Sequence, residues 1–440
     1  MTEILKAGYA QENITPDFVV CLSGAGDEHR RQADGVHHDI FVTCVAVSDG
    51  EKTVLIITND VISATTDVTA EIKKILSDDT GIPQEQIYTG NIHSHSTPRL
   101  MRHATLPGSI QFTEMVIEKL RKAAKDAIAD MEEATLEAGS TQLPGFVSVR
   151  HYLMEDGTYS GPNFGNANQR YLKEATRPDE TLMVVRFKRQ EKQDIILVNW
   201  GAHPCRPWEV GRLKIMPDYI GPLRDRLSEL TRACVTFIPG CSGNQIIDTY
   251  IPGRKHHMKH DSYGLFLANA AYSLLPKLEH VEGTKIKNIR LDYQARANHA
   301  DEDKVPQAKE VVDLFYKTDR DTSNKLAWEY GMTSVYHAMS ILGRPNRGPI
   351  MPLELNAFSI GQLGFATFQT ETPSTTSLAV RYNSPFKHTV MLCRNFTYIP
   401  TYAAYDYGSY EGSNTPYAQG TAEEATQRMS EMLCKIYYND

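Results

Sequence analysis

The sequence lacks long apolar runs. Its 440 residues contain no uninterrupted hydrophobic stretch of about 18 residues, so we predict no transmembrane segment. The opening segment, MTEILKAGYAQENITPD, has neither a basic nor an apolar leader region, and we expect no secretory signal. The seven cysteines form no C-x-x-C pair, and their number is odd. We therefore predict reduced, mostly buried cysteines and a cytoplasmic protein.

The chain also lacks an excess of basic residues. Its formal net charge is −8, and Lys and Arg form no stripe. Proteins that bind nucleic acid need clustered cations to neutralise phosphates, so nucleic acid is not expected as a partner. Hydrophobic residues make up 41% of the chain and charged residues 23%, which is enough for a sizeable core. The sequence shows no repeat, low-complexity tract or linker that would mark a domain boundary, and it does not decide whether the protein forms a homo-oligomer.

Strand-type and helix-type patterns alternate along the chain. Residues 39–47 and 53–60 predict a β-hairpin, and further apolar β-type runs predict strands at 86–92, 181–187, 194–202, 234–240 and a hairpin within 354–369. Helical spacing of apolar residues predicts helices at 65–81, 111–130, 217–230, most of 301–342 and 422–440. Residues 394–420 contain six tyrosines and no regular period, which predicts an irregular, functional segment. The fold class expected is α/β, with mixed β-sheet layers flanked by helices.

Residues that can bind metals follow several predicted strands. His93 and His95, in NIHSHSTP, are one residue apart, so on a strand both would point to the same side. His203 follows the strand at 194–202, and Glu371 follows the second strand of the hairpin. Each has an alternative without a metal. His93 and His95 could be histidines hydrogen-bonded to a neighbour, His203 a structural histidine, and Glu371 a helix cap. Together they repeat one pattern, a strand followed by a ligand-type residue and a turn, and they would supply the three ligands typical of a zinc hydrolase.

Ser242 lies in the Gly-flanked turn FIPGCSGNQ after another predicted strand. The segment is not G-x-S-x-G, so a nucleophile elbow is not indicated. Its glycines would instead let backbone groups approach a bound group closely. Elsewhere the histidine-rich loop GRKHHMKH, residues 253–260, is expected to be solvated surface, and His37 and His38 are candidates for orienting the metal ligands.

Five separated segments resemble the catalytic domain of the neutral/alkaline (non-lysosomal) ceramidase family. They are AGYAQENITP (7–16, with Asn13 where the family has an acid), DGVHHDIFVTCVAVSDG (34–50), HSHSTP (93–98), CSGN (241–244) and YIPTYAAYDYGSYEG (398–412). The match runs in order over nearly the whole chain. The resemblance implies a single catalytic domain, residues 1–440, without the further C-terminal β-sandwich domain of longer ceramidases.

The resemblance also implies site residues and an activity. It assigns a Zn²⁺ ion to four ligands, which are His93, His203, Glu371 and Tyr398. It assigns the reacting centre to His95, Arg150, Ser242 and Tyr410. The implied reaction is hydrolysis of an N-acyl amide by metal-activated water, on ceramide or on a smaller soluble amide. The alternatives are a metal-dependent esterase or lactonase that uses the same site, and a relative that binds a ligand without catalysis.

Overall fold

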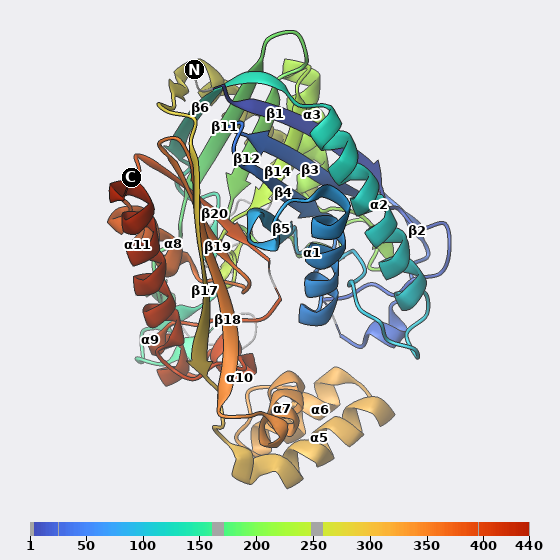
Figure 1. Ribbon diagram of the computed structural model, residues 1–440. Helices are drawn as coiled ribbons and strands as arrows, with labels where there is room; N and C mark the ends of the chain where they lie inside the picture. The colour runs from blue at the N-terminus through green and yellow to red at the C-terminus, as the bar shows by residue number, and fades with distance from the viewer. Residues whose placement is uncertain (1–3, 25, 161–170, 248–257, 395, 440) are drawn as a thin grey trace.

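The computed structural model describes residues 4–24, 26–160, 171–247, 258–394 and 396–439, and it shows two stacked sheets between layers of helices (Figure 1). The larger sheet has nine strands. Its spatial order is β14 (Cys234–Pro239), β12 (Ile195–Trp200), β11 (Thr181–Arg189), β6 (Glu132–Gln142), β1 (Lys6–Asn13), β3 (Phe41–Ser48), β4 (Thr53–Asn59) and β5 (Ile87–Asn91), with β16 (Glu279–His280) paired to β6. The second sheet is β17 (Ile286–Arg296), β18 (Ile350–Ile360), β19 (Leu363–Phe368) and β20 (His388–Cys393).

Both sheets are mixed, as the sequence predicts. Most neighbouring strands are antiparallel, including the predicted hairpins β3–β4 and β18–β19. Three pairs are parallel: β4 with β5, β12 with β14, and β19 with β20. The carboxyl ends of two parallel neighbours lie at the same edge of a sheet, so the segments that follow them meet there.

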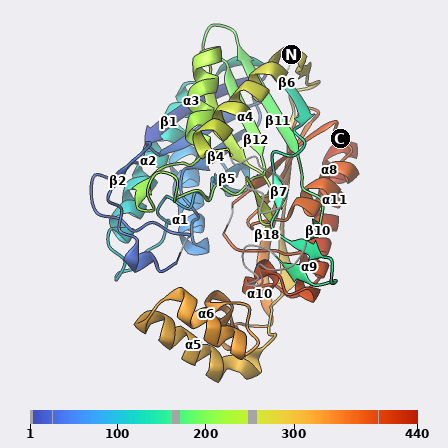
Figure 2. The same ribbon diagram turned by 180° about the vertical axis from the view of Figure 1, so that it is seen from behind.

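Helices cover the outer face of each sheet. The larger sheet carries α1 (Thr66–Thr80), α2 (Ser109–Ala129), α3 (Ile220–Thr231) and α4 (His260–Leu274). The smaller sheet carries α8 (Ser374–Asn383) and α11 (Thr421–Tyr438), and Figure 2 shows these helices on the opposite side of the molecule from α1. Three more helices are inserted between β17 and β18, with their own small core: α5 (Val305–Lys317), α6 (Arg320–Glu329) and α7 (Val335–Gly343).

Shorter elements connect these layers. Small sheets pair β2 (Gly35–Val36) with β13 (Lys214–Ile215), β7 (Ser148–Val149) with β15 (Gln245–Ile246), and β8 (Tyr152–Met154) with both β9 (Tyr159–Ser160) and β10 (Tyr171–Glu174). The 3-10 turns are Glu28–Arg30, Gln84–Gln86, Leu275–Lys277, Glu302–Lys304 and Arg344–Asn346. The tyrosine-rich segment predicted to be irregular contains two short helices, α9 (Tyr402–Asp406) and α10 (Tyr410–Asn414); each is too short to show a helical period in the sequence.

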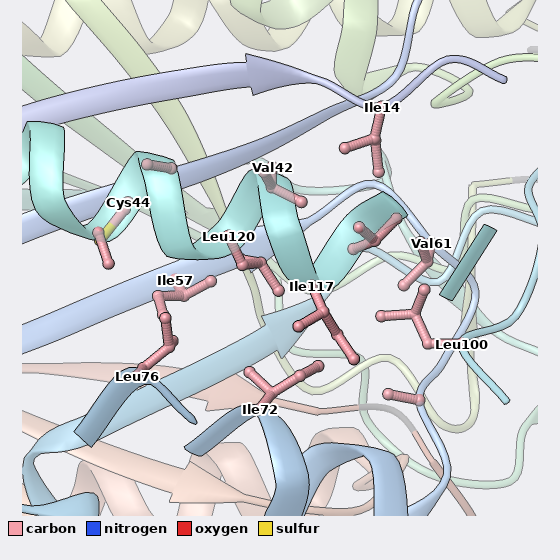
Figure 3. Packing of buried hydrophobic residues seen from close by; sticks show 14 of the residues in the cluster. Ile14, Val42, Cys44, Ile57, Val61, Ile72, Leu76, Leu100, Ile117 and Leu120 are labelled. Atoms are coloured by element: carbon pink, nitrogen blue, oxygen red, sulfur yellow. The ribbon is translucent and has the colours of Figure 1, made fainter. Parts of the chain in front are cut away.

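Alternation along the strands builds the layered core. On β3, Cys44 faces α1 and α2 while its neighbour Val45 faces the second sheet. Figure 3 shows the first of these cores, where Ile72 from α1 and Leu120 from α2 point toward strand residues such as Ile57. A strand with apolar residues on both faces is buried on both sides, which explains the continuous apolar runs of the sequence.

A buried ion pair joins α1 to the second sheet. The Nζ of Lys73 lies 2.8 Å from Oε1 of Glu354 on β18. Burial by itself would raise the pKa of Glu354, but Arg394 and Lys73 outweigh it and lower the pKa from 4.5 to about 2. Because the folded pKa is depressed, this group stabilises the fold at pH values above 4.5, and the contribution is lost as the pH falls through about 2.

We therefore expect Glu354→Gln to lower the free energy of unfolding at neutral pH, by about 3–5 kcal/mol, because it leaves Lys73 buried without its charged partner. The difference between variant and wild type should shrink as the pH is lowered from 4.5 toward 2. Urea unfolding of both proteins across that pH range measures it. A difference that stayed constant with pH would contradict the electrostatic role.

Candidate active site

The predicted site residues meet at the carboxyl ends of the parallel strands. His93 follows β5, His203 follows β12, and Ser242 follows β14. Glu371 follows β19 and Tyr398 follows β20, and the backbones of these two residues form an isolated parallel bridge. Five candidate residues thus lie at one edge of the two sheets, each after a strand of a parallel pair.

His93 and His95 converge, although not in the way their spacing predicts. Strand β5 ends at Asn91, and His93 has a left-handed backbone with φ of 68°, so the pair lies in a turn rather than on a strand. The expectation that strand alternation aligns the two rings is therefore wrong. The turn brings their ring centroids to 5.3 Å from each other, and to 4.6 Å and 5.0 Å from that of His203. A left-handed conformation is costly for a non-glycine residue and is typical of functional sites.

Backbone carbonyls fix the orientation of two of the imidazoles. The Nδ1 of His93 lies 2.8 Å from the carbonyl oxygen of Ile62, and the Nδ1 of His203 lies 3.0 Å from that of Ser242. A carbonyl only accepts, so each Nδ1 carries the proton and each Nε2 presents a lone pair. The Nε2 atoms of His203 and His95 are 3.1 Å apart. This arrangement is the one that metal-binding histidines adopt.

Glu371 completes the group. Its Oε2 lies 3.3 Å from Nε2 of His93 and 3.9 Å from Nε2 of His203. This oxygen is buried, and within the described part of the chain it accepts no hydrogen bond. The alternative of a helix cap is not observed, because α8 begins after Pro373 without a side-chain cap. A buried carboxylate oxygen left without a donor, facing two imidazole lone pairs, fits a bound cation.

The protonation states also fit a metal site. Removal from water lowers the pKa of both His95 and His203 well below the ordinary value, and the closeness of the other imidazoles lowers it further. Burial alone would raise the pKa of Glu371, but its neighbours His93, His203 and Arg150 together outweigh burial and lower the pKa. Neutral imidazoles and an ionised carboxylate are the forms that bind a divalent ion.

Arg150 lies beside this group, directly after β7. Its Nη2 donates to the carbonyl of Gly243 at 2.8 Å and to the hydroxyl of Tyr398 at 3.3 Å. Its guanidinium carbon lies 5.6 Å from the ring centroids of both Tyr398 and Tyr410. The two tyrosine rings meet edge to face at 5.8 Å. Arg150 therefore connects the tyrosine-rich segment to the turn that contains Ser242.

Comparison of structures finds similar proteins where comparison of sequences finds none. The sequence matches no protein-family profile and no curated protein. Among solved structures it is similar to the neutral ceramidase of Pseudomonas aeruginosa, with a TM-score of 0.73 and 15% identity over 99% of this chain and 75% of that one. A ceramidase complexed with C2 gives the same values.

The fold is that of neutral ceramidase.

Within this ceramidase-like fold, contacts connect all eight residues that the sequence resemblance assigns to the site. Ser242 joins through its carbonyl, which faces His203, and Tyr410 joins through Arg150 and Tyr398. The glycine after Ser242 explains the turn: a Cβ on Gly243 would lie 2.5 Å from the carbonyl oxygen of Glu371. The turn therefore packs closely against the backbone of Glu371, and its predicted approach to a bound group stays a prediction. Among the described residues, no helix is long and apolar enough to cross a membrane.

Glu411 is a residue of the site that the sequence patterns do not reveal. This buried carboxylate lies 2.6 Å from Nε of Arg150 and 2.6 Å from Nε2 of His151, through different oxygens. Burial would raise the pKa of Glu411, but Arg150 and His151 outweigh it and hold the pKa far below its usual range. Glu411 is thus a fixed negative charge that orients the guanidinium. No spacing in the sequence marks it, because its partners lie in a distant segment.

Two other expectations from the sequence require correction. His37 and His38 were candidates for orienting the metal ligands, but His38 binds Asp225 on α3 at 2.8 Å and His37 packs against His260. Residues 253–257 of the histidine-rich loop lie outside the described residues. His260, at the end of that loop, is buried rather than solvated, because the loop leads into α4 and its first residue packs inward.

Proposed function

We propose that this protein is a zinc-dependent hydrolase that cleaves an N-acyl amide bond, on a ceramide-like lipid or a smaller soluble amide. The observation that carries the proposal is the convergence of two oriented imidazoles on the unpaired buried oxygen of Glu371, in a neutral ceramidase-like fold. The cytoplasmic location expected from the cysteine content stays a prediction.

The ion would be held by His93, His203, Glu371 and Tyr398. Bound zinc supplies a water molecule with a pKa near neutrality and polarises a carbonyl oxygen. Burial raises the pKa of the Tyr398 hydroxyl well above its ordinary value. The hydroxyl is therefore neutral until a cation is near.

The remaining residues would act on the amide itself. Arg150 keeps its charge because Glu411 outweighs the effect of burial and raises the guanidinium pKa. Together with the Tyr410 hydroxyl, it can donate to the oxyanion of the tetrahedral intermediate, each donor being worth about 3–4 kcal/mol. His95 is neutral and borders the site, so its imidazole can take a proton from the attacking water and return it to the leaving amine.

Ser242 is assigned a positioning role. Its carbonyl orients His203, and its hydroxyl would hold substrate or water rather than attack the carbonyl carbon. An acyl group trapped covalently on Ser242 would contradict this assignment and the direct attack by water.

The test is hydrolysis of a long-chain ceramide in detergent, beside a short soluble N-acyl amine and the matching ester, each with and without a chelator. Chelator-sensitive cleavage of ceramide would establish a ceramidase. Cleavage of the soluble amide alone would keep the mechanism and assign smaller substrates. Cleavage of the ester alone would favour the esterase, and turnover that resists the chelator would refute the metal mechanism.

A further inference from the structure

A second group of metal-ligand side chains lies outside the proposed active site. One ligand-type atom each of His37, His260 and Asp261 lies within 4.8 Å of the other two. His37 follows the short strand β2, whereas His260 and Asp261 are the first residues of α4. The two imidazole rings meet edge to face, with centroids 5.7 Å apart. The tertiary fold brings these segments together from distant parts of the sequence.

The orientation of His260 is the observation that points to a ligand. Its Nδ1 lies 2.9 Å from Oε2 of Glu209, so this nitrogen carries the proton that the carboxylate accepts. Its Nε2 is buried and makes no hydrogen bond within the described residues, although Oδ1 of Asp261 lies only 2.9 Å away. A carboxylate on one imidazole nitrogen, with the other nitrogen facing a further carboxylate oxygen, is the arrangement of a metal-bound histidine.

Glu209 is itself held in place. The same Oε2 accepts a hydrogen bond from the backbone nitrogen of His260 at 2.7 Å, and its Oε1 lies 2.9 Å from Nη1 of Arg206. The positive end of the α4 dipole repels a cation at this position. The carboxylates of Glu209 and Asp261 provide the negative charge that offsets it.

We propose that His37, His260 and Asp261 bind a second divalent ion of the zinc type. Imidazole nitrogen favours zinc and similar transition metals, whereas magnesium and calcium prefer sites made of oxygen. Four-coordinate zinc with bonds of about 2.0–2.1 Å separates its ligand atoms by about 3.3 Å, so only a small inward rotation is required. The side chains of His37 and Asp261 are exposed and free to make it, and water takes the fourth position.

The second ion would join β2 to the start of α4. Glu209 orients His260, and Arg206 holds Glu209 in place. Both residues belong to the segment that follows His203, so a bound ion would stabilise that segment. This inference does not rest on the proposed hydrolase function. The pairs that His93 and His203 form with Glu371 include none of the three ligands of the second site.

The test is zinc binding in a chain from which the first site has been removed. The full-length His93→Asn/His203→Ala variant is freed of metal with a chelator, and Zn²⁺ is titrated in competition with a chromophoric chelator. We expect one equivalent to bind, and bound Co²⁺ to give a tetrahedral absorption spectrum. Adding His37→Ala or Asp261→Asn should weaken binding at least tenfold, and Glu209→Gln should weaken it roughly 10–100-fold.

His280→Ala is the matched control, because His280 is an exposed histidine on β16 and should leave zinc binding unchanged. Zinc affinity that is equally unaffected by His37→Ala and Asp261→Asn would overturn the proposal. His260 would then serve only to link Glu209 and Asp261. The outcome is independent of the first site, whose own zinc is measured as the difference between wild type and the His93→Asn/His203→Ala background.

Discussion

The His93→Asn/His203→Ala variant is expected to lose hydrolytic activity by a factor of roughly 10³–10⁵, because metal activation supplies several kcal/mol of transition-state stabilisation. Asn is chosen at position 93 because it tolerates the left-handed backbone that His93 adopts, so the turn after β5 is preserved. Zinc content and turnover of the best substrate are measured on the same preparations.

Folding is checked by circular dichroism and by the melting temperature. His280→Ala serves again as the control for removal of a histidine at the surface. Wild-type turnover in the folded double variant would exclude the metal mechanism. Loss of turnover with full retention of zinc would mean that His93 and His203 act on substrate rather than on the ion.

The second large effect is expected at Arg150. Replacement by Lys keeps the positive charge but removes the planar fork that reaches Glu411, Gly243 and Tyr398 together. If the guanidinium stabilises the oxyanion, Arg150→Lys should lower kcat roughly 10²–10³-fold, with a smaller change in KM and no loss of zinc. Steady-state kinetics and zinc content separate these quantities.

Arg189→Lys is the matched control. Arg189 is also buried and pairs with a carboxylate, Asp130 at 2.5 Å, but it lies at the far end of β11 from the site. The Arg189→Lys variant measures how much activity is lost when a buried arginine ion pair outside the site is weakened. If both variants lose the same activity, or if Arg150→Lys loses its zinc, Arg150 serves only to hold the structure.

Local patterns explain why much of the fold could be predicted. The helix predicted at 65–81 and observed as α1 ends where Gly81 adopts a left-handed backbone, a conformation that glycine adopts without steric cost. The β3–β4 hairpin and the inserted helices also follow from periodicity in their own segments. The two short helices in the tyrosine-rich segment could not be predicted, because one helical turn leaves no period to detect.

The candidate site was predictable only in part, for a related reason. His93, His203 and Glu371 each follow a strand, and a strand end is recognisable in the sequence. Glu411 has no such marker, since its role depends on Arg150 and His151, which lie far away along the chain. The same holds for His260, whose burial depends on contacts with Glu209 and His37.

The sequence alone therefore determined the α/β class, the positions of most strands and helices, and three candidate ligands at strand ends, because these depend on neighbours along the chain. Only the tertiary structure decided which of those residues face one another. It placed His95 beside His203 through the left-handed turn at His93, and it buried Glu411 against Arg150. Such pairings depend on how the layers pack, and packing brings together residues whose separation in the sequence contains no information about their contact.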